Sequence, residues 1–135
     1  MGKSLIQTTN QSVQNVSVGN IIDLGSVQRR YGPNLKLSGS NAIEIIGEGY
    51  YTITASISVA PTAIGEVSIG AYVNGVQLPG AIAVGSVSTA DNSTCLTIIG
   101  TVRKGCCCEG ADNLTLVLIS GASNVSNVSL RVEKS

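Results

Sequence analysis

The chain has 135 residues and a mass of 13.7 kDa, which is the size of one domain. Eight acidic and eight basic residues cancel, and histidine, the commonest general base, is absent. This composition argues against an enzyme, and against nucleic acid as a partner, because phosphate binding needs clustered Lys and Arg. No apolar run approaches the roughly 18 to 20 residues of a membrane span, and the polar start of the chain predicts no secretory signal.

The share of charged residues is unusually small. Only 12% are charged, against about 25% in an average globular domain. A compact monomer of this mass exposes roughly 6,600 Å², so its surface is poor in charge and prone to self-association. Two explanations remain open: copies of the same chain cover part of the surface, or the abundant Ser, Thr, Asn and Gln keep it hydrated.

The first segments in chain order are short or polar. Residues 1–19 are rich in Gln, Asn, Ser and Thr and form either an arm that reaches a partner or a weak edge strand. Short strands are expected at 20–24, 35–37 and 42–46. The remainder of the chain, residues 20–135, is expected to form the domain itself.

The middle of the chain carries the clearest strand pattern. From Tyr50 to Val59 every second residue is apolar, which is the period of a strand with one face in a core, and Pro61 ends it. Another strand follows from Glu66 to Val73. Asn74-Gly75 then predicts a type I′ hairpin turn, and Pro79-Gly80 is expected to stop the returning strand.

The remaining strands are expected at 82–88, 94–103, 113–120 and 125–133. Val, Ile and Thr make up 39 of the 135 residues, and no helical period is sustained. The sequence therefore predicts an all-β antiparallel sandwich of about ten strands. Two strands, around Cys95–Ile99 and Leu114–Ile119, are apolar on both faces, so either a neighbouring subunit or a loop covers the second face.

Several short motifs resemble the trimeric jelly roll of the tumour-necrosis-factor (TNF) and complement type, in its small bacterial and phage form. The motifs are Gly47-Glu48-Gly49-Tyr50-Tyr51-Thr52-Ile53, Ala71-Tyr72-Val73-Asn74-Gly75 with Leu78-Pro79-Gly80, and Ser129-Leu130-Arg131-Val132. The stretch from Ile22 to Gly39 is similar to opening strands of virion proteins from phages of Gram-positive bacteria. The C-terminal domains of spore-surface collagen-like glycoproteins are similar too.

The resemblance covers about residues 20 to 134 and implies a homotrimer of ten-stranded jelly rolls. In such a trimer one sheet of each subunit faces the axis, here formed by strands near 20–25, 35–38, 49–60, 94–103 and 127–133. The candidate contacts between subunits are four residues of these strands: Tyr51, Ile53, Ile99 and Leu130. The chain lacks the aromatic cluster that many members of the family place near the axis.

Cys106-Cys107-Cys108 is the most unusual motif. Consecutive cysteines in an extended chain point to alternate sides, so one chain cannot easily close a metal site with them. The alternatives are a thiol cluster between subunits, which could hold a metal ion with one cysteine from each copy, disulfides between subunits, a pair of Cys95 and Cys107 within one chain, or reduced thiols in a loop. No catalytic residues, metal ligands or cofactor are assigned.

The function expected from these features is structural. The chain is expected to be a phage virion protein, a homotrimer that decorates a capsid or forms a fibre knob in contact with other virion proteins. The alternatives are a module that binds a host glycan or receptor, and a structural domain of a spore or cell surface. No enzymatic activity, nucleic acid, membrane or cofactor is expected.

Overall fold

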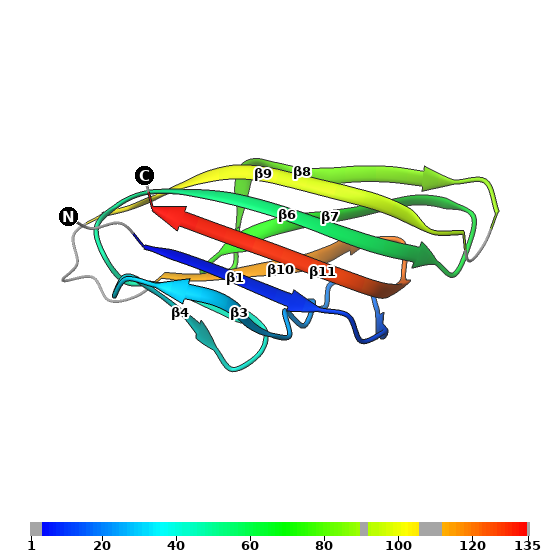
Figure 1. Ribbon diagram of the computed structural model, residues 1–135. Helices are drawn as coiled ribbons and strands as arrows, with labels where there is room; N and C mark the ends of the chain where they lie inside the picture. The colour runs from blue at the N-terminus through cyan, green and yellow to red at the C-terminus, as the bar shows by residue number, and fades with distance from the viewer. Residues whose placement is uncertain (1–3, 90–91, 106–111, 135) are drawn as a thin grey trace.

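The computed structural model describes residues 4–89, 92–105 and 112–134 and shows two antiparallel sheets packed face to face (Figure 1). The strands in the described residues are β1 (Leu5–Asn10), β2 (Gln14–Val16), β3 (Ser26–Tyr31), β4 (Leu35–Ser38), β5 (Ala42–Ile45), β6 (Gly49–Pro61), β7 (Gly65–Val73), β8 (Val76–Val87), β9 (Thr94–Lys104), β10 (Asp112–Ser120) and β11 (Ser123–Lys134). These ranges contain no helix of the length and hydropathy that a membrane span requires. The prediction of an all-β antiparallel sandwich is confirmed.

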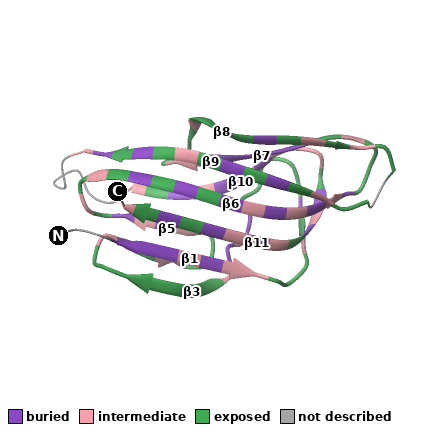
Figure 2. Cartoon of the chain, turned by 45° about the horizontal axis from the view of Figure 1, so that its top comes forward, coloured by how far each residue is buried: buried purple, intermediate pink, exposed green. Residues whose placement is uncertain are grey.

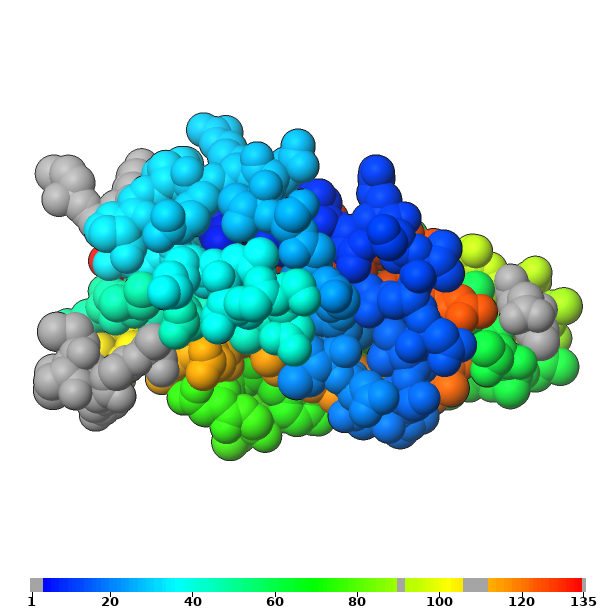
Figure 3. All heavy atoms as spheres, turned by 90° about the horizontal axis from the view of Figure 1, so that it is seen from below, coloured from blue at the N-terminus to red at the C-terminus, as the bar shows by residue number. Residues whose placement is uncertain are grey.

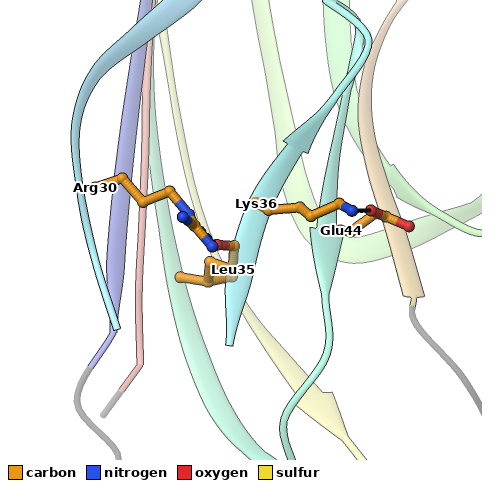
Figure 4. Close-up of polar contacts among 4 residues, drawn as sticks. All are labelled: Arg30, Leu35, Lys36 and Glu44. Carbon is orange, nitrogen blue, oxygen red and sulfur yellow. Dashed lines mark hydrogen bonds and ion pairs between the residues drawn. The ribbon is translucent and has the colours of Figure 1, made fainter. Parts of the chain in front are cut away.

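The two sheets have a jelly-roll strand order. Sheet A has the order β3-β1-β11-β6-β9, with β2 also paired to β11, and sheet B has the order β4-β5-β10-β7-β8. Where β3 and β4 meet at one edge of the sandwich, Arg30 Nε donates a hydrogen bond of 2.6 Å to Leu35 O (Figure 4). At the other edge, β9 approaches β8 so closely that a Cβ added at Gly100 would lie 2.9 Å from the Ala81 Cβ.

The alternating pattern of β6 is confirmed in full. The five apolar residues at every second position of this strand are buried against sheet B: Tyr51, Ile53, Ala55, Ile57 and Val59. The same alternation runs along β9 and β11 and gives the banded colouring of these strands in Figure 2. Each of the three strands therefore sends one set of side chains into the core and leaves the other set on the outside of the molecule.

Two forms were predicted for residues 1–19, an arm or a weak edge strand, and the described residues 4–19 contain both a short strand paired with β11 alone, β2, and the longer strand β1. β1 lies inside sheet A, paired with β11 on one side and β3 on the other. Leu5 and Ile6 are buried, and Ile6 and Val16 belong to the hydrophobic core. Backbone hydrogen bonds hold a strand inside a sheet whatever its side chains are, and for that reason the polar composition of this segment was misleading.

Two strands assigned to the axis-facing sheet lie elsewhere. Residues 35–38 form β4, which belongs to sheet B. Residues 20–25 form no strand, and backbone hydrogen bonds and a bridge between Ile21 and Val117 place the start of this segment beside β10 of sheet B. The described residues contain eleven strands rather than ten, because β1, β2 and β3 are added, 20–24 is lost, and two predicted strands merge into β8.

The hairpin between β7 and β8 has the predicted turn. Asn74 and Gly75 have φ values of 53° and 82°, and Val73 pairs directly with Val76. Positive φ at both central residues is the requirement of a type I′ turn. Pro79, however, does not end β8: the strand lies at the edge of sheet B, where a residue without an N–H is tolerated, and the register shifts opposite Gly70–Tyr72.

Candidate functional site

The outward face of sheet A is rich in small hydroxyl side chains. Its exposed or half-buried residues on β6, β9 and β11 include Thr52, Thr54, Ser56, Ser58, Cys95, Thr97, Ile99, Thr101, Asn127 and Ser129. Ser129 pairs with Ser56, and Ser56 pairs with Thr97, so one row across three strands consists of hydroxyls alone. Short side chains in register protrude little from the sheet, so a second chain can approach this row closely.

Charge is sparse on this face and is largely confined to one end. Arg131 NH2 and Glu133 Oε1 are 3.6 Å apart on β11, and both side chains are about half exposed. Arg103 stacks over the ring of Tyr50 at 6.0 Å, and Arg29 stacks over the ring of Tyr31 at 5.4 Å. Arg131 pairs with Thr54, which pairs with Ile99, so this charge reaches the row of Ile99, whereas the neighbouring row of Ser129, Ser56 and Thr97 carries no charge.

A polar depression of about 500 Å³ lies where β1, β3 and β11 meet on the same face. It is lined by three glutamines, an asparagine and two hydroxyl residues: Gln7, Gln11, Gln28, Asn127, Thr9 and Ser129. Thr9 Oγ1 donates a hydrogen bond of 3.4 Å to Gln28 Oε1. Amides and hydroxyls can donate and accept hydrogen bonds, so this depression could bind the polar surface of another chain without any charge.

Three of the four predicted subunit contacts are corrected by the burial of their side chains. Tyr51, Ile53 and Leu130 are at most 1% exposed in the single chain, because they point between the two sheets. A side chain without accessible surface cannot contact a second copy of a folded chain. The strands were correctly placed in sheet A, but the apolar residue of each alternating pair belongs to the core of the subunit rather than to its outside.

Ile99 has the opposite orientation. It is 66% exposed in the middle of β9, although its neighbour Ile98 is buried. It lies opposite Thr54 of β6 and is surrounded by hydroxyl residues on the outward face. Ile99 therefore remains a candidate contact.

Tyr51 is buried in the core, and its hydroxyl group has a hydrogen-bond partner there. The Tyr51 hydroxyl donates a hydrogen bond of 2.6 Å to Gly47 O, at the start of the strand. Burial raises the pKa of this phenol above its usual value of about 10, and the hydrogen bond to the backbone partly offsets the increase. The side chain thus remains neutral in the core.

The thiols give no metal site in the part of the chain that the structure describes. Cys106, Cys107 and Cys108 lie outside the described residues, so the predicted cluster between subunits stays a prediction. Cys95 is a free, exposed thiol on the outward face of sheet A, with its Sγ 3.5 Å from Ser56 Oγ. Within the described ranges, no group of three or more His, Cys, Asp or Glu side chains could hold a metal ion.

A second concave surface lies on the outside of sheet B, where the sequence analysis assigned nothing. This groove has a volume of about 570 Å³ and runs between Ile21 and the tip of the β7–β8 hairpin, with Thr115 and Val117 of β10 as its floor. Tyr72 and Asn74 form the hairpin side. Only the Asn-Gly turn was visible in the sequence, because the residues of this groove are far apart along the chain.

The comparisons with known proteins identify a fold. No protein-family model and no curated protein sequence matches the chain. Among solved structures, Eiger TNF from S. frugiperda superposes with a TM-score of 0.74 at 12% identity, covering 99% of this chain and 92% of that one. Murine APRIL gives 0.76 at 11% identity, covering 98% and 99%.

A complement protein gives the same result. The globular domain of the zebrafish complement 1qA protein has a TM-score of 0.70 at 7% identity and covers 96% of this chain and 94% of that one. At such low identity the likeness describes the fold and not the function. The chain has the jelly-roll fold of TNF and C1q globular domains.

Proposed function

We propose that the chain is a non-enzymatic structural protein of a phage virion, a homotrimer that decorates a capsid or forms the knob of a fibre. The short motifs of residues 20–134 support the virion context by resemblance, and the fold supports the trimer, since that resemblance implies subunits with one sheet toward a common axis. A sandwich of two packed sheets suits a protein that must withstand the environment of a particle surface.

The observation that carries the proposal is the outward face of sheet A. Eight acidic and eight basic residues share a single-chain surface of 6588 Å², and few of them lie on this face. The row of Ser129, Ser56 and Thr97 consists of hydroxyl residues, and the next row holds Ile99, Thr54 and Arg131, whose charge is paired with that of Glu133. A surface with few charges loses little solvation energy when a second copy covers it, because few charges have to be buried.

An exposed edge supports the same arrangement. All six residues of β3 are exposed in the single chain, and among the described residues no strand pairs with its outer side. Val27 and Tyr31 of this strand are 42% and 40% exposed. An unpaired strand edge with apolar side chains is a surface that proteins commonly cover, and closure of a trimer would cover it here.

The assembly is tested by light scattering with the variant Ile99→Asp. The unaltered chain is expected at three times its mass of 13.7 kDa. Ile99→Asp is expected at the mass of one folded chain, because the side chain is exposed in the subunit but its charge would be buried between subunits. The matched control is Ile64→Asp, since Ile64 is 70% exposed and lies outside sheet A; this variant should stay trimeric.

Two results would contradict the proposal. A single-chain mass for the unaltered protein would exclude the trimer, and a trimeric Ile99→Asp would exclude this face as its interface. The virion context is tested by the genes that flank its own, which should encode capsid, tail or fibre components. A neighbourhood without virion genes would contradict the phage assignment and leave the trimer untouched.

A further inference from the structure

The groove on the outside of sheet B is a preformed structure. On one wall, residues 19–22 run beside β10, with Gly19 N donating to Leu118 O at 2.7 Å and Ile22 N donating to Leu116 O at 2.8 Å. In Figure 3 this blue segment, the orange β10 and the green β7–β8 hairpin meet on one face of the molecule. The wall is therefore held by backbone hydrogen bonds, which fix its position relative to the floor.

The opposite wall is fixed by Asn74 at the hairpin tip. Its Nδ2 donates a hydrogen bond of 3.0 Å to Asp112 Oδ1, and its Oδ1 accepts one of 2.8 Å from Asn113 N. Asn74 N also donates to Asn113 O at 2.8 Å. Three hydrogen bonds thus join the tip of the hairpin to the start of β10, and the groove between the two walls does not have to form upon binding.

The lining combines an aromatic ring with uncharged polar groups. Tyr72 is half-buried and pairs with Thr115, so its ring lies beside a hydroxyl group on the floor. Asn113 is exposed at the end of the groove. Within the part of the chain that the structure describes, the side chains of Tyr72, Asn113 and Thr115 have no hydrogen-bond partner of their own.

Glycines keep the groove open at both walls. Gly19 and Gly75 line it with φ values of 88° and 82°, and a Cβ added at either residue would meet nothing within 4 Å. The space beside these residues is therefore free for a ligand. None of the described residues that line the groove is charged.

From this chemistry we propose that the groove binds a neutral pyranose sugar, either free or at the end of a glycan. The apolar C–H face of a sugar ring packs on an aromatic side chain, while its hydroxyls both donate and accept hydrogen bonds. Tyr72 supplies the ring, Asn113 supplies an amide that donates and accepts, and Thr115 supplies a hydroxyl. The groove volume of about 570 Å³ lies in the range of small-molecule sites.

The site lies within one subunit and does not depend on the proposed trimer. The groove is on sheet B, whereas the proposed contact between copies is on sheet A. Loss of sugar binding and loss of assembly are consequently separate results. Binding is measured by NMR of the sugar, and assembly is measured by the mass of the protein in solution.

The test is saturation-transfer NMR on the full chain with a defined panel of sugars. The neutral probes are the methyl glycosides of glucose, galactose, mannose, fucose and N-acetylglucosamine, together with lactose; glucosamine and N-acetylneuraminic acid are the charged probes. At least one neutral probe should give a saturable signal with a Kd in the range of about 1 mM. The strongest saturation is expected at its ring C–H protons, which would face Tyr72.

Variants connect that signal to the groove. Tyr72→Ala should weaken binding about tenfold or more by removing the ring, and Asn113→Ala should weaken it severalfold without affecting the fold, since this side chain is exposed. The matched control is Tyr50→Ala, because Tyr50 is 56% exposed on the outward face of sheet A; its binding should equal that of the unaltered chain.

Three results would overturn the inference. The first is no saturable signal from any neutral probe up to about 20 mM. The second is a signal from the charged probes alone. The third is a signal that survives in both Tyr72→Ala and Asn113→Ala while their thermal unfolding shows that the variants are folded.

Discussion

At the scale of single residues, the direction of each side chain decides its role in this protein. Tyr50 and Tyr51 are neighbours in the sequence, yet Tyr50 is 56% exposed while Tyr51 is fully buried and donates a hydrogen bond to Gly47. In the same way, Ile98 is buried whereas its neighbour Ile99 is exposed. In a strand with period two, the identity of a residue says little about its role until the face it occupies is known.

Thr8 offers a test of how the core tolerates a polar group. Its side chain is fully buried, and its Oγ1 is a buried side-chain atom without a hydrogen-bond partner among the described residues. Because a buried hydroxyl without a partner costs free energy, Thr8→Val should raise the free energy of unfolding by about 1 kcal/mol. Urea denaturation at a fixed chain concentration measures the change.

The matched control for that substitution is Thr89→Val. Thr89 is exposed, so this change should alter the free energy of unfolding by less than about 0.5 kcal/mol. If Thr8→Val destabilised the protein, the Thr8 hydroxyl would have to possess a partner, and this description of the core would be wrong.

At the scale of elements, β1 shows how a polar segment becomes a structural strand. Only two of its six residues, Leu5 and Ile6, are strongly apolar, which is why its sequence resembles an arm. Its backbone nevertheless pairs along its length with β11 and for most of its length with β3. The two-sided pairing makes β1 necessary for the continuity of sheet A.

Ile6→Ala tests this placement of β1. Ile6 is fully buried in the core, so the truncation should lower the free energy of unfolding by about 2–5 kcal/mol. Val13→Ala is the matched control from the same N-terminal region, because Val13 is 70% exposed; it should change the value by less than about 0.5 kcal/mol. Equal effects in the two variants, measured by urea denaturation, would restore the interpretation of residues 1–19 as an arm.

The segment that crosses sheet B is held by Asp23 and not by apolar contacts alone. Asp23 Oδ1 accepts a hydrogen bond of 2.7 Å from Gly25 N, and Oδ2 accepts one of 3.1 Å from Ser40 Oγ. Gln14 binds the backbone of the same residue twice, through Asp23 N and Asp23 O at 2.9 and 3.0 Å. These hydrogen bonds hold the chain directly after residues 19–22, the wall of the sheet B groove. No short sequence motif predicts them.

At the scale of the whole molecule, low charge is the property that bears most on assembly. Attraction between exposed charges is screened by salt, whereas contacts of neutral hydroxyls, amides and apolar groups are not. The proposed interface on sheet A carries few charges, and its Arg131 and Glu133 are paired with each other. The mass measured by light scattering should therefore stay that of the trimer from about 0.05 to 0.5 M NaCl.

The ion pair of Arg131 and Glu133 on the same face provides a comparison for the salt experiment. Arg131→Ala and Glu133→Ala break the pair on β11, in which both side chains are about half exposed, and should leave the mass unchanged at each salt concentration. Dissociation of the unaltered protein as salt is added would show that ion pairs hold the copies together. The uncharged side chains on the outward face of sheet A would then not form the interface.

The sequence by itself determined the fold class, the principal strands β6, β7, β9, β10 and β11, and the Asn74-Gly75 turn, because these depend on short-range periods and on local backbone preferences. Only the tertiary structure decided which strands share a sheet, that Leu5–Asn10 belongs inside sheet A, and that Tyr51, Ile53 and Leu130 face the core of the subunit rather than a second copy. Those outcomes depend on pairing between strands far apart in the chain. The groove beside Tyr72 has the same origin, since it unites three segments that only the packing of the sandwich brings together.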